Sequence, residues 1–382
     1  MRNPAYKILV SAAASMLLFA CKPGRVVTGK SKKKDTVATV RKLDSLDIKI
    51  GQMVMVGIEE RTMIDPNDSL LAELRDGKMG GVVLFEKNIA KTNSADSFRN
   101  MTRAMQQAAL IPIFVTIDEE GGKVHRLKEK YGFVGMPSAS YLGGIDNPDS
   151  TLFYNRRLAA EMHDLGINLN YAPCVDVAVN PENPVIVKNG RSFSADPEIV
   201  TKHALLCIQA HHENSLRTIL KHFPGHGSSA NDSHLGIADV TNTWKFIELE
   251  PYKNIIESGE VDAIMTAHII NRAFDTLPAT LSKKIISDKL RGFLRYDGVV
   301  FSDDMQMHAI AENFGFENAI ALSINAGVDV VMFANTIPNL QGRLSASKVH
   351  AIIKNHVANG TIKKERIDEA YRRIMDLKKK KF

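Results

Sequence analysis

From about residue 44 onward, short apolar runs alternate with stretches that have the spacing of amphipathic helices, and this alternation limits the fold more than any other feature. Eight apolar runs occur, at residues 52–58, 81–85, 113–117, 167–172, 218–221, 263–267, 298–302 and 328–333. Helix-like segments separate them, at residues 95–109, 149–165, 197–214, 244–257 and 316–326, and a last one covers 362–377. Nearly continuous apolar strands separated by helices are typical of a parallel sheet covered on both faces.

Eight such units in about 340 residues favour the α/β class, as a single (β/α)8 TIM-type barrel. Such barrels usually have roughly 250 residues and can exceed 400 with insertions. An open doubly wound sheet is the alternative, but no glycine-rich phosphate-binding motif follows the first run. Because no repeat and no Pro/Gly-rich break is seen after residue 44, we expect one domain over residues 43–382.

The first 21 residues have the pattern of a lipoprotein signal peptide. Arg2 and Lys7 precede an apolar run at residues 8–20, which ends at Cys21. We expect Cys21 to carry the lipid and residues 22–42 to form a basic, flexible tether. The chain would then be anchored to a membrane in the bacterial cell envelope, facing the periplasm or the exterior. The alternative is a signal peptide with an incidental cysteine.

The net charge of +6 is concentrated in the tails. Residues 1–21 carry +2, residues 22–34 carry +6 and residues 378–381 carry +4, so that residues 35–377 carry −6. A mildly acidic body argues against a nucleic-acid partner. Besides Cys21, only Cys174 and Cys207 are present. Two isolated cysteines make no disulfide framework, and we expect buried free thiols.

Polar residues follow the apolar runs closely, as a barrel enzyme would require at the carboxyl ends of its strands. They are Asp118–Glu120 and Arg126, Asp176, the cluster from Lys221 to His234, His268, Asp303 and Asp304, and Asn335. Asp303 follows a run that should be buried, where a carboxylate is costly unless it is paired or used. We expect Asp303 to be the reactive member and Asp304 the structural one, although both could cap the next helix.

The stretch from residue 221 to 234 is the densest polar cluster. Pro224 and Gly225 exclude a regular helix, so the cluster is predicted on a loop after a strand. Asp232 and His234, at i and i+2, could point the same way, with the carboxylate orienting the imidazole for acid and base catalysis. A metal site of His222, His226 and His234 is a rival interpretation. The pair His211 and His212 is expected at the surface.

The motifs IDEEGGKVHRL (117–127), NGRSFSADP (189–197), KHFPGHGSSANDSH (221–234), MTAH (265–268) and FSDDMQM (301–307) resemble those of glycoside hydrolase family 3. The similarity is to its single-domain β-N-acetylglucosaminidase branch, often called NagZ-type, and covers the chain from roughly residue 43. It implies a retaining β-N-acetylhexosaminidase that removes terminal β-linked N-acetylglucosamine, with peptidoglycan fragments (muropeptides) as the expected substrates. No metal or organic cofactor is implied, and we expect a monomer.

The resemblance also implies residue roles. Asp303 would be the nucleophile, and His234, oriented by Asp232, the acid and base. Sugar binding maps onto Asp118, Arg126, Arg191, Lys221 and His222. A family arginine after the Gly-Gly pair is Lys123 here. Two alternatives remain: a β-glucosidase of the same family, and a non-catalytic glycan-binding lipoprotein.

Overall fold

The computed structural model describes residues 45–231, 236, 238–336 and 343–380. Within the compact unit Leu43–Phe382, eight parallel strands close into a barrel in the order β1-β10-β9-β7-β5-β4-β3-β2. The strands are β1 Val54–Gly57, β2 Gly81–Leu84, β3 Phe114–Ile117, β4 Leu169–Asn170, β5 Arg217–Phe223, β7 Ala263–Thr266, β9 Val299–Asp304 and β10 Val330–Phe333. The predicted barrel is therefore confirmed.

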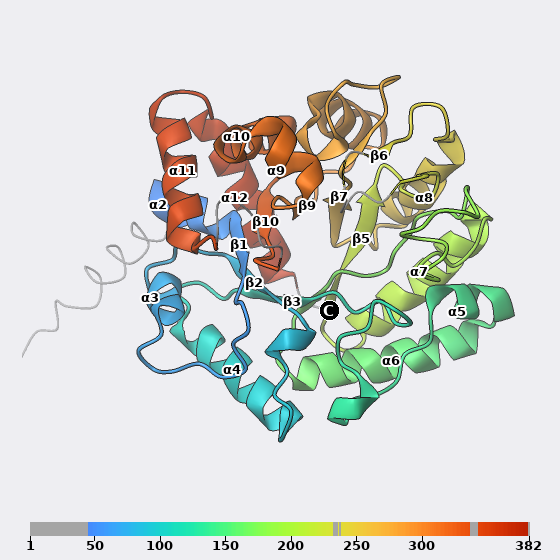
Figure 1. The fold of residues 1–382 in the computed structure, drawn as a ribbon, viewed down its shortest axis with the longest axis horizontal. Helices are drawn as coiled ribbons and strands as arrows, with labels where there is room; N and C mark the ends of the chain where they lie inside the picture. Colours follow the sequence, from blue (N-terminus) through green and yellow to red (C-terminus); the bar gives the residue numbers. More distant parts are fainter. Residues whose placement is uncertain (1–44, 232–235, 237, 337–342, 381–382) are drawn as a thin grey trace, which may run out of the picture. The chain divides into compact units, whose positions relative to one another are not determined.

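Helices surround the barrel strands (Figure 1). They are α2 Leu46–Gln52, α3 Ser69–Arg75, α4 Ser94–Ala108, α5 Ala139–Ile145, α6 Pro148–Asp164, α7 Pro197–His212, α8 Glu250–Ser258, the π-helix η5 Lys284–Phe293, α9 His308–Phe314, α10 Phe316–Ala326, α11 Ala346–Ala358 and α12 Lys364–Lys379. None of the helices in this described part is long and apolar enough to cross a membrane.

Two of the longest helices begin with the same sequence pattern, a polar residue followed by proline. Asn147 accepts a hydrogen bond from the Ser150 backbone N–H at 3.0 Å, and Pro148 opens α6. Asp196 accepts from the Glu198 N–H at 2.9 Å, and Pro197 opens α7. A polar cap followed by proline satisfies a free N–H and sets the first helical φ angle, which explains why both helices begin where they do.

Two strands are longer than predicted, and both extensions carry site residues. β5 continues beyond Lys221, the last residue of the predicted run, through His222 to Phe223, although we expected the polar cluster to leave the strand there on a loop. β9 includes Asp303 and Asp304, which we expected just after the strand. An apolar run ends at the first polar residue, whereas a strand continues as long as its buried polar side chains find partners.

The barrel interior is filled rather than open. The rings of Phe114 and Phe301, from β3 and β9, pack edge to face with centroids 5.9 Å apart. Lys378 of α12 donates to the Gln52 side chain at 2.6 Å and to the Gly80 carbonyl at 2.9 Å, which fastens the C-terminal helix to residues that precede β1 and β2. The carboxyl ends of the strands are thus left as the place for a cavity.

A two-stranded parallel sheet was not predicted. It joins β6 Ala238–Asp239 to β8 Ile269–Ile270. Each strand has only two residues, too few to produce a recognisable alternation in the sequence.

Candidate active site

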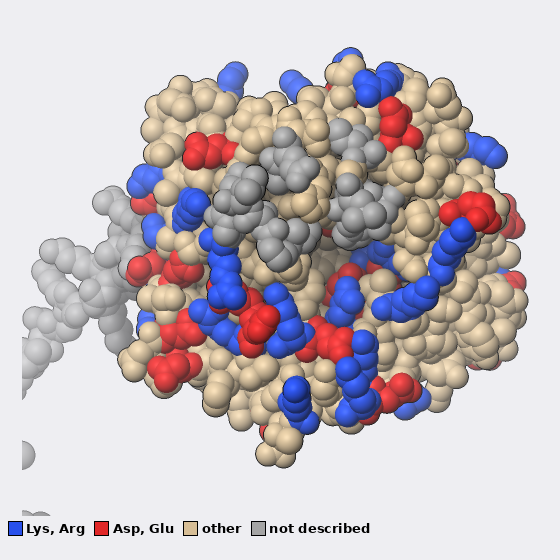
Figure 2. All heavy atoms as spheres, viewed as in Figure 1, with Lys and Arg blue, Asp and Glu red and all other residues tan. Residues whose placement is uncertain are grey.

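A cavity of about 540 Å³ lies at the carboxyl ends of the barrel strands, within the usual size range of small-molecule sites. Its walls combine apolar and charged side chains from seven strands or the loops that follow them, among them Phe85, Asp118, Tyr171, Lys221, Met265, Asp303 and Met332. Figure 2 shows a hollow near the middle of this face, with Lys, Arg, Asp and Glu side chains along its border.

The cavity brings together every predicted site residue that the structure describes. Asp303 and the five predicted sugar-binding residues line it: Asp118, Arg126, Arg191, Lys221 and His222. Asp232 and His234, the predicted acid and base pair, lie outside the described residues, as does Cys21. The geometry of the predicted Asp232–His234 pair therefore stays a prediction.

Alternating charges connect four of the cavity residues through a buried carboxylate. The Lys221 ammonium pairs with Asp118 and lies 2.6 Å from Glu120 Oε1. Arg191 donates from Nε and Nη2 to the two oxygens of Glu120, at 2.8 and 2.7 Å. On the other side, Arg126 donates to Asp118 Oδ2 at 3.2 Å. Each carboxylate is thus held by two cations, so the donors of the cavity keep fixed positions.

The protonation states of this network follow from its geometry. Burial raises the pKa of Glu120, but Arg191 and Lys221 outweigh that effect and hold the pKa well below its usual range. Burial lowers the pKa of Lys221, while Asp118 and Glu120 raise it above its usual value. Glu120 is therefore an anion and Lys221 a cation at neutral pH. Together they give the cavity charged hydrogen-bonding groups suited to sugar hydroxyls.

Asp176 determines how His222 presents its ring. His222 Nδ1 lies 2.7 Å from Asp176 Oδ2, and Asp176 Oδ1 accepts the N–H of His222 at 3.2 Å and of His226 at 2.8 Å. Burial raises the pKa of Asp176, yet His222 and its other donors hold it at about 2. Nδ1–H therefore donates to the carboxylate, and Nε2 accepts from Arg191 Nη2, 3.2 Å away.

The two neighbouring aspartates at the end of β9 have different surroundings. Asp304 Oδ1 accepts the backbone N–H of Gln306 at 3.0 Å and of Ala334 at 3.1 Å, which ties β9 to the loop after β10. Asp303 lines the cavity, and its Oδ1 accepts the Asp304 N–H at 2.7 Å. Both aspartates line the cavity, but Asp304 is buried and holds two backbone N–H groups, in agreement with its expected structural role, whereas Asp303 is partly exposed.

Glu119 orders the loop that carries Arg126. Its Oε2 accepts the backbone N–H groups of Arg126 and Leu127, each at 2.9 Å, and its Oε1 pairs with His125. Burial lowers the pKa of His125, but the hydrogen bond and charge of Glu119 raise it above its usual value. Of the three acidic residues after β3, one therefore faces the cavity, one orders a loop, and Glu120 binds Arg191.

Cys174, Asp176 and His222 form a group of potential metal ligands, whose ligand atoms lie within 4.8 Å of one another. Cys174 Sγ donates to Asp176 Oδ2 at 3.2 Å, and His222 Nδ1 donates to the same oxygen. A metal cation bound there would replace the protons on Cys174 Sγ and His222 Nδ1. The remaining imidazole proton would then lie on Nε2 and face the N–H of Arg191, so that two donors would oppose each other. The observed hydrogen bonds therefore fit a proton-linked cluster better than a metal centre. Cys174 and Cys207 are both buried free thiols, as predicted.

Sequence reasoning missed the partners that orient the site. Asp176 and Glu120 were recognised only as polar residues after strands, although they hold His222 and Arg191. The prediction that His211 and His212 form a surface pair was wrong. His211 is fully buried, and its Nε2 accepts a hydrogen bond from Asn170 Nδ2 at 3.0 Å. His212 Nε2 lies 2.7 Å from Asp262 Oδ2. The helical spacing of His211 from Cys207 and Ala204, both buried, could have revealed this.

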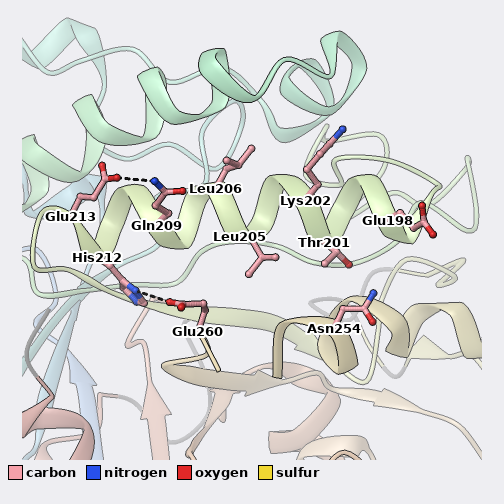
Figure 3. A pocket seen from close by; sticks show the side chains of 10 residues that line it. All are labelled: Glu198, Thr201, Lys202, Leu205, Leu206, Gln209, His212, Glu213, Asn254 and Glu260. Carbon is pink, nitrogen blue, oxygen red and sulfur yellow. Dashed lines mark hydrogen bonds and ion pairs between the residues drawn. The ribbon is translucent and has the colours of Figure 1, made fainter. Parts of the chain in front are cut away.

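A larger cavity, of about 900 Å³, lies between α7 and α8 (Figure 3). Its lining includes Leu205, Leu206, His212 and Asn254, and Figure 3 shows His212 directed toward Glu260. None of the predicted site residues in the described part of the chain lines this second cavity. We place the candidate active site at the strand ends, because charged and oriented groups converge there.

Comparison with known proteins gives a consistent picture. The glycosyl hydrolase family 3 N-terminal domain matches residues 45–377. Beta-hexosaminidase A of Pseudoalteromonas piscicida is 34% identical over 342 residues, which cover 84% of this chain and 56% of that protein. Beta-hexosaminidase of Tolumonas auensis is 34% identical over 267 residues, which cover 69% of this chain and 77% of that protein.

Among solved structures, the chain is similar to a glycoside hydrolase family 3 β-N-acetylglucosaminidase from Paenibacillus sp. str. FPU-7. The TM-score is 0.79 at 31% sequence identity, and the match covers 87% of this chain and 62% of the Paenibacillus protein. The chain thus spans little more than half the length of the Pseudoalteromonas relative and under two thirds of the Paenibacillus one.

Proposed function

This chain belongs to glycosyl hydrolase family 3, and we propose that it is a β-N-acetylhexosaminidase that removes terminal β-linked N-acetylglucosamine. The observation that carries the proposal is the cavity at the strand ends, where Asp303 and five predicted sugar-binding residues converge. Relatives at 34% identity that are named beta-hexosaminidases support the same substrate class.

The proposed mechanism has two displacements and retains the configuration of the sugar. A carboxylate oxygen of Asp303 attacks the anomeric carbon as the glycosidic C–O bond breaks, and His234 gives its proton to the departing oxygen. Water then attacks the anomeric carbon, His234 takes the proton of the water, and Asp303 leaves. The position of Asp303 at the cavity wall supports its role, whereas the roles of His234 and Asp232 rest on the sequence resemblance.

The buried charge network would bind the sugar ring before either displacement. Asp118 can accept hydrogen bonds from hydroxyl groups, while Lys221 and Arg191 donate. Because Glu120 and Asp176 hold Arg191 and His222 from behind, these groups need little reorganisation when a sugar binds. We further propose muropeptides or related peptidoglycan fragments as natural substrates, on the basis of the family resemblance.

The test is hydrolysis of nitrophenyl β-N-acetylglucosaminide beside nitrophenyl β-glucoside by the full-length chain. We expect the N-acetyl substrate to be preferred, and we expect the same preference in phosphate and in non-phosphate buffers. Proton NMR should show the β-anomer as the first product. Preference for the glucoside would overturn the N-acetyl assignment and favour a β-glucosidase. No turnover of either substrate would favour a non-catalytic glycan-binding protein, and release of the α-anomer would contradict retention.

We also propose that Cys21 anchors the protein to a membrane of the cell envelope. The apolar run that ends at Cys21 and the basic residues 22–34 support this proposal. Metabolic labelling with a fatty acid should label the wild-type chain and not Cys21→Ala. Equal labelling of the two, or none of either, would contradict the anchor.

A further inference from the structure

Asn183, in the segment between β4 and α7, is fully buried and uses every hydrogen-bonding group of its side-chain amide. Its Oδ1 accepts the N–H groups of Val185 and Ile186 at 2.9 and 2.7 Å. Its Nδ2 donates to the carbonyls of His226 and Gly227 at 2.8 and 3.1 Å. One side chain therefore joins two loops that follow different strands, β4 and β5.

Both ends of this bridge lead to proposed site residues. On the accepting side, the backbone N–H of Arg191 donates to the Ile186 carbonyl at 2.9 Å, and Val185 lines the cavity. On the donating side, His226 and Gly227 follow Lys221 and His222 in the loop after β5. The amide of Asn183 thus sets the position of the segment that leads from Val185 to Arg191 relative to the start of the β5 loop.

The start of the β5 loop is closely packed at the same place. A methyl group on Gly227 would lie 1.7 Å from the Val177 carbonyl oxygen, so only glycine fits there. Asn180 Nδ2 donates to the Ser229 carbonyl at 3.0 Å, and the Asn180 N–H donates to the Gly227 carbonyl at 3.1 Å. Only Ala230 and Asn231 separate Ser229 from Asp232, so the anchored part ends about three residues before the proposed acid and base.

We propose that Asn183 is a positioning residue for catalysis, which acts on the proposed acid and base through the anchored backbone of His226 and Gly227. This inference rests on the proposed function, because it takes Asp232 and His234 as the pair that protonates the departing oxygen. Burial, four hydrogen bonds and a bridge between two loops all favour a role in holding the β5 loop. Asparagine suits the position because its amide donates on one side and accepts on the other.

The effect of Asn183 should depend on the leaving group. A nitrophenolate departs with little help from an acid, whereas a sugar alkoxide needs the proton. A displaced acid therefore slows cleavage of N,N′-diacetylchitobiose more than cleavage of nitrophenyl β-N-acetylglucosaminide. General loss of folded protein, by contrast, lowers both rates by the same factor.

The experiment measures kcat/KM for both substrates in Asn183→Ala and Asn183→Asp. Asn183→Asp keeps the shape and both accepting contacts but loses both donors. The matched control is Asn168→Ala. The Asn168 side chain also joins backbone groups, since it accepts the Val115 N–H at 2.9 Å and donates to the Ile113 carbonyl at 2.9 Å. It lies before β4, however, and does not line the cavity. His234→Ala serves as the reference for a missing acid.

In both Asn183 variants, we expect kcat/KM for the disaccharide to fall by a factor about tenfold or more larger than the fall for the nitrophenyl substrate. In Asn168→Ala, we expect the two substrates to be affected equally. Equal losses on the two substrates in the Asn183 variants, with a clear difference in His234→Ala, would overturn the inference alone. If His234→Ala itself shows no difference, the proposed acid and base is wrong. If an Asn183 variant does not fold, the other variant decides.

Discussion

Arg191 donates to both oxygens of Glu120, although the two residues come from loops that follow different strands. Both side chains are almost fully buried, and Lys221 also lies against Glu120. An anion in this position keeps two cations oriented toward the cavity without a sugar present. The charge of Glu120 therefore supports the site and the fold together.

We expect Glu120→Gln to destabilise the protein by about 3–5 kcal/mol, because the change leaves buried cations without their counter-charge. KM for the nitrophenyl N-acetyl substrate should rise as well, since Arg191 and Lys221 lose their fixed positions. Urea denaturation and steady-state kinetics measure the two effects. The control is Glu182→Gln, since Glu182 pairs with Lys188 at an exposed site and should contribute less than about 1 kcal/mol. Equal stability of the two variants would contradict the role of Glu120.

Asp176→Asn should weaken substrate binding through His222. An amide cannot accept donors on both sides as the carboxylate does, so the imidazole loses the arrangement that leaves Nε2 facing Arg191. We expect kcat/KM to fall about 10–100-fold, mainly through KM. Asp196→Asn, at the start of α7, should leave the kinetics unchanged because asparagine caps helices as well as aspartate. Wild-type kinetics in Asp176→Asn would show that His222 needs no such partner.

Glu248 should make stability depend on pH. The Glu248 carboxyl group is fully buried under the β5 loop. It accepts the backbone N–H groups of Ser228 and Lys245, each at 3.2 Å, and the negative charge of Asp176 acts on it. Burial raises its pKa from 4.5 to about 7. Because the folded state binds this proton more tightly, the contribution of Glu248 to stability is greatest below pH 4.5 and falls as the pH rises toward 7, by about 3 kcal/mol at most.

Glu248→Gln should remove that pH dependence, which thermal unfolding between pH 5 and pH 8 measures. The variant should lose stability relative to wild type at the acidic end and gain on it as the pH rises. Glu257→Gln, on the exposed face of α8, is the matched control. A constant difference between Glu248→Gln and wild type across this range would contradict the raised pKa.

The barrel could be predicted because each strand is a short apolar run and each helix repeats its apolar positions. The site could be placed because polar residues such as Asp118 and Asp303 follow those runs. The different roles of acidic residues that are adjacent in the sequence could not be predicted. Asp118, Glu119 and Glu120 are three acidic residues in a row, and only the fold shows that the third meets Arg191, 71 residues away.

Contacts between distant segments explain the remaining errors. His211 appears to be half of a polar pair in the sequence, but its place on α7 puts it against Asn170 of β4. Lys221 continues β5 because Asp118 and Glu120 compensate its charge, and neither partner is near it in the sequence. Burial of a polar group depends on partners that the local sequence does not contain.

The central claim is that Asp303 is the nucleophile of a family 3 β-N-acetylhexosaminidase. The most direct test compares turnover of nitrophenyl β-N-acetylglucosaminide by wild type and by Asp303→Asn, with circular dichroism to verify folding. We predict that wild type hydrolyses the substrate and that the variant loses at least about 1,000-fold in kcat while remaining folded. A folded variant with a rate within tenfold of wild type would contradict the claim.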